Sequence, residues 1–567
     1  MKAEDRKDCL FIHCPKFSNW YAPFGEFMSI LYMPMGLMGL ADVARNAGYS
    51  SEVVHLGVEW IVTNQKGGEP FEIVEYVRKH RPMLVALPLF WHYQIWDTIE
   101  VAKQIKAAVP ETFILLGGYT ASIFPDEIFD NFDAIDGIVQ GHGEEPLRKL
   151  LAALRDGRDP EQMAQVPNLA WRCGGQAIYN EARWVATDAD VDQFRTSDLS
   201  LLRNRDVYIE ISGFPLVWMK HAPHAMNRRV ASRTSLFPLF VGRGCSVSCS
   251  WCGGGKGGHR KFNFSNHVLW QRPEKVVETI REALSFGYDG MYVCFDPKPK
   301  EDYFPRLFRL LQEEDLSPHF YFECWSLPTE EFVAEFAKAF PGDKGTIALS
   351  PESGSAKVRR RNKGFKYSDE ELFDAMDMLE RYQVNFDLFF SVGMPFETEH
   401  DVPLTRDMIA KARDLYAYLR WVLVMPMQME PGSPMFNRPD KFGITTDRRS
   451  LMDFYDAHSR MDSDPYTCLG YASPNFFDDG SGADQKVFEQ RIKALRCKYF
   501  CLLESNEPQY NSLRGRSKCK VLESMWKVRS IGNDKRAEPV VMPAAPAQDP
   551  QPRYSRVRGS LRRLRRQ

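Results

Sequence analysis

The chain has 567 residues, of which 44% are hydrophobic and 26% are charged, and its formal net charge is −2. This composition is typical of a soluble globular protein, and a chain of this length is expected to fold into two or three domains. The near-neutral charge gives no reason to expect binding to nucleic acid or to anionic lipid.

Neither a membrane span nor a signal peptide is predicted. The most apolar run, residues 28–41, is too short to cross a bilayer and contains Pro34. The first nine residues, MKAEDRKDC, contain no apolar stretch of the kind that signal peptides carry. We therefore expect a cytoplasmic protein without a membrane contact.

Residues 8–155 alternate short apolar runs with amphipathic, helix-like segments. The apolar runs are 9–15, 51–57, 82–90, 112–118 and 133–141. Near-continuous apolar strands that alternate with helices indicate a parallel sheet covered on both faces. Five such units predict an α/β domain with a flavodoxin-like, Rossmann-type doubly wound sheet.

A second alternating series begins at residue 235. Residues 156–234 are less regular and are predicted to be a connector with short strands. The apolar runs of the second series are 236–244, 290–296, 319–326, 345–354, 385–395 and 418–428. Six strands with intervening helices predict a partial (β/α)6 barrel over 235–435, with its chemistry at the carboxyl ends of the strands.

The alternation weakens after Gly432. Residues 436–530 are predicted to form a mainly helical C-terminal domain, with helices near 446–460 and 484–504. Residues 531–567 are rich first in Pro, Ala and Gln and then in Arg, so a disordered basic tail is predicted there.

Three closely spaced cysteines stand out among the 12 in the chain. Cys245, Cys249 and Cys252 follow the strand predicted at 236–244. In an intracellular chain such a cluster indicates metal binding and not a disulfide. A structural zinc site needs a fourth ligand, and the nearest candidate, His259, has no matching partner. Three thiolates in one loop can instead hold a 4Fe–4S cluster and leave one iron open.

A glycine-rich segment, residues 253–258, follows the cysteines directly. It is not a P-loop, because no Ser or Thr follows Lys256. We expect a flexible loop beside the metal centre.

The CxxxCxxC spacing, with Trp251 before the last cysteine, resembles the signature of the radical S-adenosylmethionine (SAM) superfamily. In that family the three cysteines bind a 4Fe–4S cluster, and the open iron binds the amino and carboxylate groups of SAM. The resemblance implies this role for Cys245, Cys249 and Cys252.

Other segments resemble the SAM-binding motifs of the same family. Residues 350–355 and 361–364 are similar to its "ESGS…NKG" segment, and residues 391–398 are similar to its "G-x-P-x-E-T" turn. Asp296 ends the second barrel strand, where relatives carry an acid that faces SAM or substrate. The SAM contacts that the resemblance implies are Trp251, Gly253, Asp296, Ser350, Glu352, Ser353 and Gly393.

The N-terminal sheet lacks the G-x-G-x-x-G loop of flavin and dinucleotide folds. Residues 115–122 and 139–147 resemble the cobalamin-binding domain of class B radical SAM methyltransferases. The implied cobalamin contacts are Phe90, Trp91, Gly117, Gly118, Gly141, Gly143 and Glu144, with His92 and Tyr93 as further candidates beneath the corrin. The D-x-H-x-x-G motif is absent and His55 lies on the wrong strand, so no protein histidine is expected on the cobalt.

The resemblance, over about residues 8–435, implies a cobalamin-dependent radical SAM C-methyltransferase. Such an enzyme moves methyl from SAM through methylcobalamin to a poorly nucleophilic carbon of a small molecule, often in a natural-product or pigment pathway. An external electron donor such as flavodoxin or ferredoxin and a monomeric state are expected, and residues 436–530 are expected to set specificity.

Three alternatives remain open from the sequence. They are a cobalamin-dependent radical rearrangement or cyclisation, a polar methyl transfer without a deoxyadenosyl radical, and a zinc-stabilised binding protein without catalysis. No residue is assigned as a general base.

Overall fold

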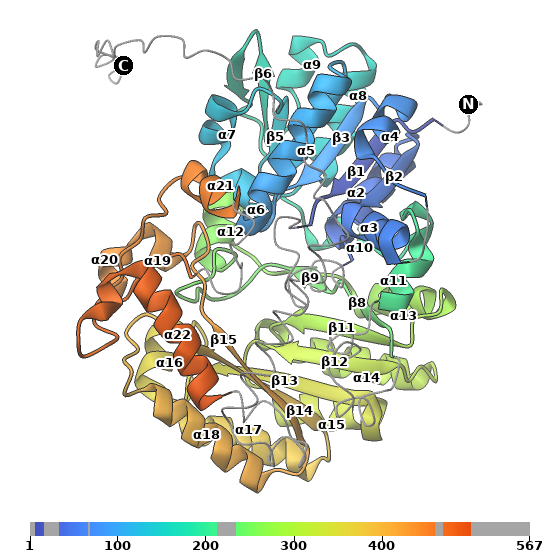
Figure 1. The fold of residues 1–567 in the computed structure, drawn as a ribbon. Helices are drawn as coiled ribbons and strands as arrows, with labels where there is room; N and C mark the ends of the chain where they lie inside the picture. The colour runs from blue at the N-terminus through green and yellow to red at the C-terminus, as the bar shows by residue number, and fades with distance from the viewer. Residues whose placement is uncertain (1–5, 16–32, 66–68, 212–233, 460–468, 501–567) are drawn as a thin grey trace, which may run out of the picture. The chain divides into compact units, whose positions relative to one another are not determined.

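The computed structural model describes residues 6–15, 33–65, 69–211, 234–459 and 469–500 (Figure 1). The basic tail predicted at 531–567 lies outside these residues. No helix among the described residues combines the length and the apolar character that crossing a bilayer would need.

The N-terminal sheet has the strand order β2-β1-β3-β4-β5-β6-β7. Its five parallel strands are β1 (Cys9–His13), β2 (Ser51–His55), β3 (Leu84–Pro88), β4 (Phe113–Gly117) and β5 (Gly137–Val139). The order 2-1-3-4-5 is that of flavodoxin-like domains. The doubly wound α/β fold predicted for this part is therefore confirmed.

Two antiparallel strands extend this sheet beyond residue 155. β6 (Leu169–Cys173) pairs with β5, and β7 (Gln176–Tyr179) pairs with β6 through a hairpin. The segment predicted as a connector thus contributes to the first sheet. Its apolar residues alternate too briefly for the sequence pattern alone to assign them to a sheet. The remaining connector elements are α10 (Asp188–Gln193), η4 (Leu199–Leu201) and α11 (Arg205–Ile211).

Helices cover both faces of the first sheet because its buried strands are apolar on both sides. On β1, Phe11 belongs to one buried cluster, whereas Leu10 and Ile12 belong to another. The helices and the 3-10 turn of this part are α2 (Met35–Asn46), α3 (Leu56–Gln65), α4 (Ile73–His80), η3 (His92–Gln94), α5 (Ile95–Ala108), α6 (Tyr119–Ile123), α7 (Pro125–Asn131), α8 (Glu144–Arg155) and α9 (Pro160–Ala164).

The second sheet contains six parallel strands in the order β15-β14-β13-β12-β11-β8, as a partial barrel requires. Its strands are β8 (Leu236–Pro238), β11 (Gly290–Phe295), β12 (His319–Cys324), β13 (Gly345–Glu352), β14 (Asn385–Val392) and β15 (Leu419–Pro426). The predicted run 236–244 is divided after Pro238: β9 (Gly242–Arg243) pairs separately with β10 (Leu269–Trp270).

Helices follow the barrel strands and cover one face of the sheet. They are α12 (Lys256–Phe262), α13 (Pro273–Ser285), α14 (Tyr303–Glu313), α15 (Glu330–Ala339), α16 (Ala356–Asn362), α17 (Asp369–Arg381) and α18 (Val402–Leu415), with short turns η6 (Lys298–Lys300) and η7 (Gly342–Lys344). Because side chains alternate along each strand, residues between the helix-facing ones face the barrel interior.

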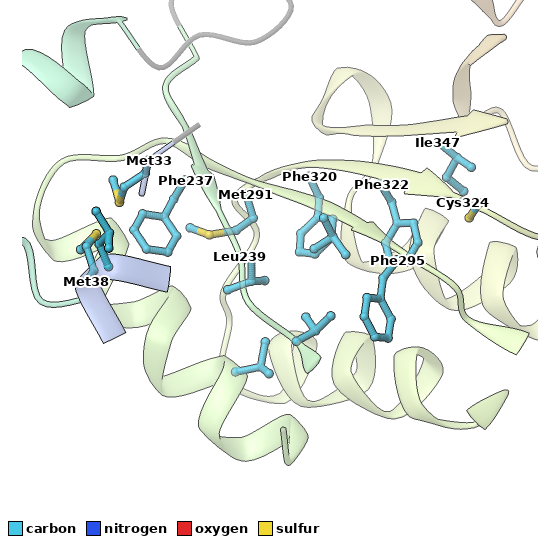
Figure 2. Packing of buried hydrophobic residues seen from close by; sticks show 14 of the residues in the cluster. Met33, Met38, Phe237, Leu239, Met291, Phe295, Phe320, Phe322, Cys324 and Ile347 are labelled. Atoms are coloured by element: carbon cyan, nitrogen blue, oxygen red, sulfur yellow. The ribbon is translucent and has the colours of Figure 1, made fainter. Parts of the chain in front are cut away.

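One apolar core joins the two sheets. Figure 2 shows Phe237, Met291, Phe320 and Phe322 of the barrel strands pointing toward the helices, with Met38 of α2 at the end of the row. All five side chains are buried in the same cluster. The first domain and the barrel are therefore packed together and are not merely tethered.

The C-terminal segment has no separate core in its described part. It contains α19 (Pro434–Asn437), α20 (Pro439–Phe442), α21 (Leu451–Ser459), η8 (Ser481–Ala483) and α22 (Gln485–Tyr499). Leu451 and Phe454 of α21 are buried with the helices of the first sheet, whereas Phe488 and Ile492 of α22 are buried with the barrel. Each of these two helices buries its apolar face against a different neighbour, and a mainly helical C-terminal domain at 436–530 stays a prediction.

Candidate functional site

The three cysteines lie in the loop that follows β9, beyond the carboxyl end of β8. Cys245, Cys249 and Cys252 are free and partly exposed. Burial raises the pKa of the Cys245 thiol to about 11, and the Gly364 N–H donates to Cys249 Sγ over 3.2 Å. Three thiols in one loop, with a backbone donor aimed at a sulfur, fit the donor set of an iron–sulfur cluster.

His259 is engaged within its own helix. Its Nδ1 lies 2.9 Å from Nδ2 of Asn263, the residue that caps the C-terminus of α12. No three His, Cys, Asp or Glu side chains in the described part of the chain are arranged as ligands of a single ion. The glycine-rich segment is also more ordered than expected, since α12 begins at Lys256 within it, so the expected flexible loop is wrong for residues 256–258.

Two serines attach the cysteine loop to the barrel. Ser250 Oγ donates to Asn362 Oδ1 over 2.6 Å. Ser246 Oγ donates to Asp296 Oδ2 over 2.9 Å, and Ser326 Oγ donates to the other carboxylate oxygen over 2.6 Å. Asp296, expected to contact SAM, therefore uses both oxygens inside the protein and links the loop to the ends of β11 and β12. Its SAM contact stays a prediction.

Glu352 is the best placed of the expected SAM ligands. It ends β13 at a bulge, with φ of 66°, and it is partly exposed. Its Oε2 accepts a hydrogen bond from Ser391 Oγ over 2.8 Å, and Lys363 Nζ lies 3.4 Å from Oε1. A non-glycine residue in the left-handed region costs about 1–3 kcal/mol, and such strain is concentrated at ligand sites. Lys363 also donates to the Ser350 carbonyl. Ser350 and Glu352, the two expected SAM ligands on β13, therefore contact the same lysine ammonium.

Ser353 and Gly393 use their polar groups inside the protein. The buried Ser353 Oγ accepts from the Ser355 N–H over 3.1 Å. The Gly393 N–H donates to Glu397 Oε2 over 2.6 Å, and its carbonyl accepts from the Tyr471 hydroxyl. A Cβ at Gly393 would lie 3.2 Å from Leu469, and its φ is 84°. The glycine is thus explained by backbone conformation and packing, and any SAM contact there stays a prediction.

Some of the side chains facing the barrel interior are partly exposed. Cys294 on β11, Glu323 on β12 and Trp325 just after β12 alternate with buried residues. The Tyr292 hydroxyl donates to Glu323 Oε2 over 2.8 Å, and Trp325 Nε1 lies 3.0 Å from Cys294 Sγ. Burial raises the pKa of Glu323. The motifs gave no signal for this lining, because each residue sits alone on its strand.

The carboxyl edge of the first sheet carries exposed aromatic residues. Phe90 and Trp91, after β3, are 49% and 40% exposed, and their rings meet edge to face at 4.8 Å. A Cβ at Gly117 would have no neighbour within 4 Å, whereas Gly118 has φ of 99°. Doubly wound sheets bind ligands at this edge. Exposed aromatic rings beside glycine backbone there fit a large planar cofactor.

The other expected cobalamin residues lie against the barrel. A Cβ at Gly141 would lie 3.1 Å from Asn263 Cα, and Glu144 forms an ion pair with Arg243 of β9. Gly143 packs on Leu40. The loop after β5 therefore meets the end of α12 at Asn263 and β9 at Arg243, and a cobalamin contact from Gly141, Gly143 or Glu144 stays a prediction.

His92 follows Phe90 and Trp91 in the sequence but, unlike these two residues, it is not exposed. It is buried, and its Nδ1 lies 3.0 Å from His458 Nε2 of α21. Burial lowers the pKa of His92 to about 3. Because the ring is buried against His458, a contact of His92 with the corrin stays a prediction. His55 is buried against His13, with ring centroids 4.3 Å apart.

The carboxyl edge of the first sheet faces the cysteine loop. The Tyr119 hydroxyl, after β4, donates to the Gly253 carbonyl beside Cys252, and its ring meets Phe262 of α12 at 5.7 Å. Figure 1 shows α6 and α12 side by side. Both elements belong to the same compact unit of the chain. The carboxyl edge of the first sheet and the cysteine loop of the barrel, each suited to a cofactor, therefore meet where Tyr119 contacts Gly253. We call this contact region the junction.

Two family models match the chain: the B12 binding domain over residues 31–151 and the Radical SAM superfamily over residues 239–409. The chain thus combines a B12 binding domain with a Radical SAM domain, and the cofactors that go with these two domains are cobalamin, SAM and a 4Fe–4S cluster.

Curated relatives match parts of the chain. The anaerobic magnesium-protoporphyrin IX monomethyl ester cyclase of Cereibacter sphaeroides is 24% identical over 268 residues, 47% of this chain and 37% of that protein. The hopanoid C-3 methylase of Methylococcus capsulatus is 28% identical over 122 residues, 21% of this chain and 22% of that protein. The matches span well under half the length of these relatives.

Solved structures match the fold more fully. TsrM of Kitasatospora setae, a radical SAM methyltransferase with cobalamin and a [4Fe-4S] cluster bound, has a TM-score of 0.58 at 16% identity, covering 79% of this chain and 84% of TsrM. OxsB, with aqua-cobalamin bound, has a TM-score of 0.56 at 13% identity, covering 93% of this chain and 72% of OxsB. The likeness shows a shared fold.

Several residues at the junction were not anticipated from the sequence. Glu430, after β15, accepts from the Gly253 N–H over 2.8 Å, and no motif surrounds it. Tyr119 lies within the GG-containing segment but had no assigned role. Glu397 and Lys363 lie within the segments 391–398 and 361–364, and their hydrogen-bond partners are set by how the two loops fold.

Proposed function

We propose that this chain is a cobalamin-dependent radical SAM C-methyltransferase that acts on a small molecule. The observation that supports the proposal most is the junction of Tyr119 with Gly253, where the cobalamin-binding edge meets the cysteine loop. A methyl carrier and a radical source must both reach one substrate carbon. The contact of Tyr119 with Gly253 would bring the cobalamin edge of the first sheet and the cysteine loop near one substrate. The fold shared with the methyltransferase TsrM adds to this support.

The chain's own residues position the two cofactors. Cys245, Cys249 and Cys252 would hold the cluster, Glu352 would bind SAM, and Phe90 and Trp91 would cover the corrin. When bound, the cluster and SAM supply a reductively generated carbon radical, and cobalamin supplies a methyl carrier. Tyr119 and Gly253 are buried where the two parts meet, so water would be kept from this contact. The barrel interior, lined by Glu323 and its neighbours, offers polar contacts to SAM or substrate.

A second candidate is a radical ring closure or rearrangement without net methylation. The relative from Cereibacter sphaeroides, named as a cyclase, favours it over a match of 268 residues. The junction would serve either reaction, because both need a substrate radical beside cobalamin.

Product analysis separates these reactions. The full chain would be reconstituted anaerobically with iron, sulfide and hydroxocobalamin, and then turned over with SAM, reductant and panels of aromatic and polycyclic small molecules. We expect both S-adenosylhomocysteine and 5′-deoxyadenosine. Deoxyadenosine without S-adenosylhomocysteine would favour rearrangement, and S-adenosylhomocysteine alone would favour polar methyl transfer. A Cys252→Ala variant is the control and should form no deoxyadenosine.

The remaining partners belong to the same proposal. A flavodoxin or ferredoxin would reduce the cluster, and the protein would act in the cytoplasm as a monomer. Reduction kinetics with a purified flavodoxin and the mass measured by light scattering test these points.

A further inference from the structure

Tyr119 lies between the two cofactor sites. It is buried, and its hydroxyl donates to the Gly253 carbonyl, next to Cys252 in the sequence. The same Gly253 donates its N–H to Glu430 Oε2 over 2.8 Å. The peptide groups adjoining the last cysteine are therefore held from the first domain on one side and from the end of the barrel on the other.

Two glycines make room for this contact. A Cβ at Gly258 would overlap both the Tyr119 hydroxyl and the Gly253 carbonyl oxygen, and a Cβ at Gly253 would overlap the Pro431 carbonyl oxygen. At the neighbouring Gly257, the nearest atom to a Cβ would be Ser248 Oγ at 3.5 Å. The severe overlaps are thus at positions 253 and 258, whereas a Cβ at Gly255 would lie 3.0 Å from Ser248 Cα, away from Tyr119.

Tyr119 is also attached to the exposed aromatic residues of the cobalamin edge. It follows Gly117 and Gly118 directly, and its ring lies 6.4 Å from the ring of Phe90. The next residue, Thr120, donates its hydroxyl to the Phe90 carbonyl over 2.8 Å. A continuous set of contacts thus leads from Phe90 through Tyr119 to the residue beside Cys252.

We propose that Tyr119 is a positioning residue that makes the cluster loop respond to the presence of cobalamin. A cofactor resting on Phe90 and Gly117 would fix the turn that carries Tyr119, and the tyrosine hydroxyl would then orient the Gly253 peptide beside the cluster. Hydrogen bonds and dipoles around an iron–sulfur cluster tune its potential, so the two sites would be coupled. This inference rests on the proposed pairing of cofactors but not on the identity of the methylated substrate.

Spectroscopy of the cluster tests the coupling without a substrate. The reconstituted full chain, with SAM, would be prepared with and without cobalamin. Low-temperature electron paramagnetic resonance of the reduced cluster would be recorded after subtraction of the cobalt signal, together with a redox titration. In the wild type we expect cobalamin to shift both the cluster signal and its midpoint potential. In Tyr119→Phe, which lacks only the hydroxyl, we expect this shift to be lost while iron and cobalt contents are kept.

Alanine substitutions in the glycine segment provide a matched pair. Gly258→Ala places a methyl group between the Tyr119 hydroxyl and the Gly253 carbonyl oxygen, which breaks their hydrogen bond without altering Tyr119, so it should also lose the shift. Gly257→Ala should retain the shift. If Tyr119→Phe fails to fold, the two glycine variants decide the question.

Several outcomes would overturn the proposal. These are a wild-type cluster that is indifferent to cobalamin, a Tyr119→Phe or Gly258→Ala variant with the full shift, and loss of the shift in Gly257→Ala. Failure of Tyr119→Phe to retain cobalt would also overturn it, because Tyr119 would then belong to the cobalamin pocket. Absence of a methylated product alone would contradict the proposed function and leave this coupling intact.

Discussion

Glu397 shows how a single side chain shapes the turn after β14. Its Oε2 accepts hydrogen bonds from the N–H groups of Gly393 and Met394, over 2.6 and 3.0 Å. The carboxyl is buried, and burial raises its pKa to about 8. The motif similar to "G-x-P-x-E-T" thus forms a turn in which the glutamate, Glu397, accepts a hydrogen bond from the backbone of the glycine, Gly393.

A Glu397→Gln variant should lose one component of the pH dependence of stability. The folded carboxyl has a pKa of about 8 against an ordinary 4.5, so folding takes up a proton between these values. The contribution of the group is therefore complete below about pH 4.5 and is lost as the pH rises through 8. Glutamine keeps the acceptor oxygen, so the variant should be as stable as wild type at low pH and relatively more stable above pH 8.

Urea unfolding over this pH range measures the difference. Glu397→Ala is the comparison, because it leaves two backbone donors without their acceptor and should cost about 1–3 kcal/mol at every pH. Equal pH slopes in wild type and Glu397→Gln would show that Glu397 is ionised in the folded protein.

Trp91 should affect cobalamin binding and not folding. It is 40% exposed, so Trp91→Ala removes little buried surface, and the melting temperature without cobalamin should stay close to that of wild type. Loss of one aromatic face against a bound ring costs about 1.4 kcal/mol, which corresponds to about a tenfold weaker affinity. Equilibrium dialysis of hydroxocobalamin measures this effect, with the exposed Leu415→Ala as the control. Unchanged affinity in Trp91→Ala would place the corrin elsewhere.

At the scale of elements, α21 is the clearest case of a segment that packs far from its sequence neighbours. Its Leu451 N–H donates to Glu127 Oε2 of α7 over 2.7 Å, and its Tyr455 hydroxyl donates to Glu100 of α5. The buried contact between His458 and His92 lies at the same interface. The helix therefore completes the surface of the cobalamin-binding domain, although it follows the barrel in sequence.

Acidification should release α21. The pKa of His92 is lowered by burial from 6.5 to about 3, so the folded protein disfavours the protonated ring. The stabilisation is complete above about pH 6.5 and is lost as the pH falls toward 3. We expect amide exchange in α21 to accelerate relative to α14 between about pH 7.5 and 5.5.

A glutamine at position 92 is the test of this mechanism. His92→Gln cannot take up a proton, so the relative exchange of α21 should depend less on pH than in wild type. A wild-type ratio of α21 to α14 exchange that does not change with pH would contradict the role of the histidine pair.

The whole molecule is built as two parallel sheets that share an apolar core and are both contacted by the C-terminal segment. Met38 and Phe237 are buried in the cluster that also contains Phe488 of α22. Because α21 and α22 pack on different sheets, the segment after β15 spans the first domain and the barrel. Removal of this segment should therefore lower the stability of both the first domain and the barrel.

A chain truncated after residue 433 should lose stability in both parts. Removing α21 exposes apolar side chains of α5 and α7, and removing α22 exposes the end of β15, so we expect a lower melting temperature and aggregation. Proteolysis followed by mass spectrometry locates the loosened regions, with a truncation after residue 500 as the control. A soluble 1–433 chain with wild-type melting temperature would show that the segment is dispensable for folding.

Much of the fold followed from periodicity. The strand alternation of β1 to β5 and of β8 to β15 predicted both parallel sheets, because strands buried on two faces must be apolar throughout. The cysteine spacing likewise predicted the loop ligands, since the three thiols are local in sequence. Contacts between distant segments could not be predicted in this way: Tyr119 with Gly253, and Asp296 with Ser246 and Ser326.

By itself, the sequence determined the two-sheet architecture, the cysteine triad and the resemblance to cobalamin-dependent radical SAM enzymes. These features are carried by residues close together along the chain. Only the tertiary structure decided that β6 and β7 extend the first sheet, that α21 and His92 pair across domains, and that Gly141 and Glu144 face the barrel. The physical reason is that such pairings depend on which apolar faces and polar groups meet after folding, and a single side chain on its own strand or helix does not specify its partner.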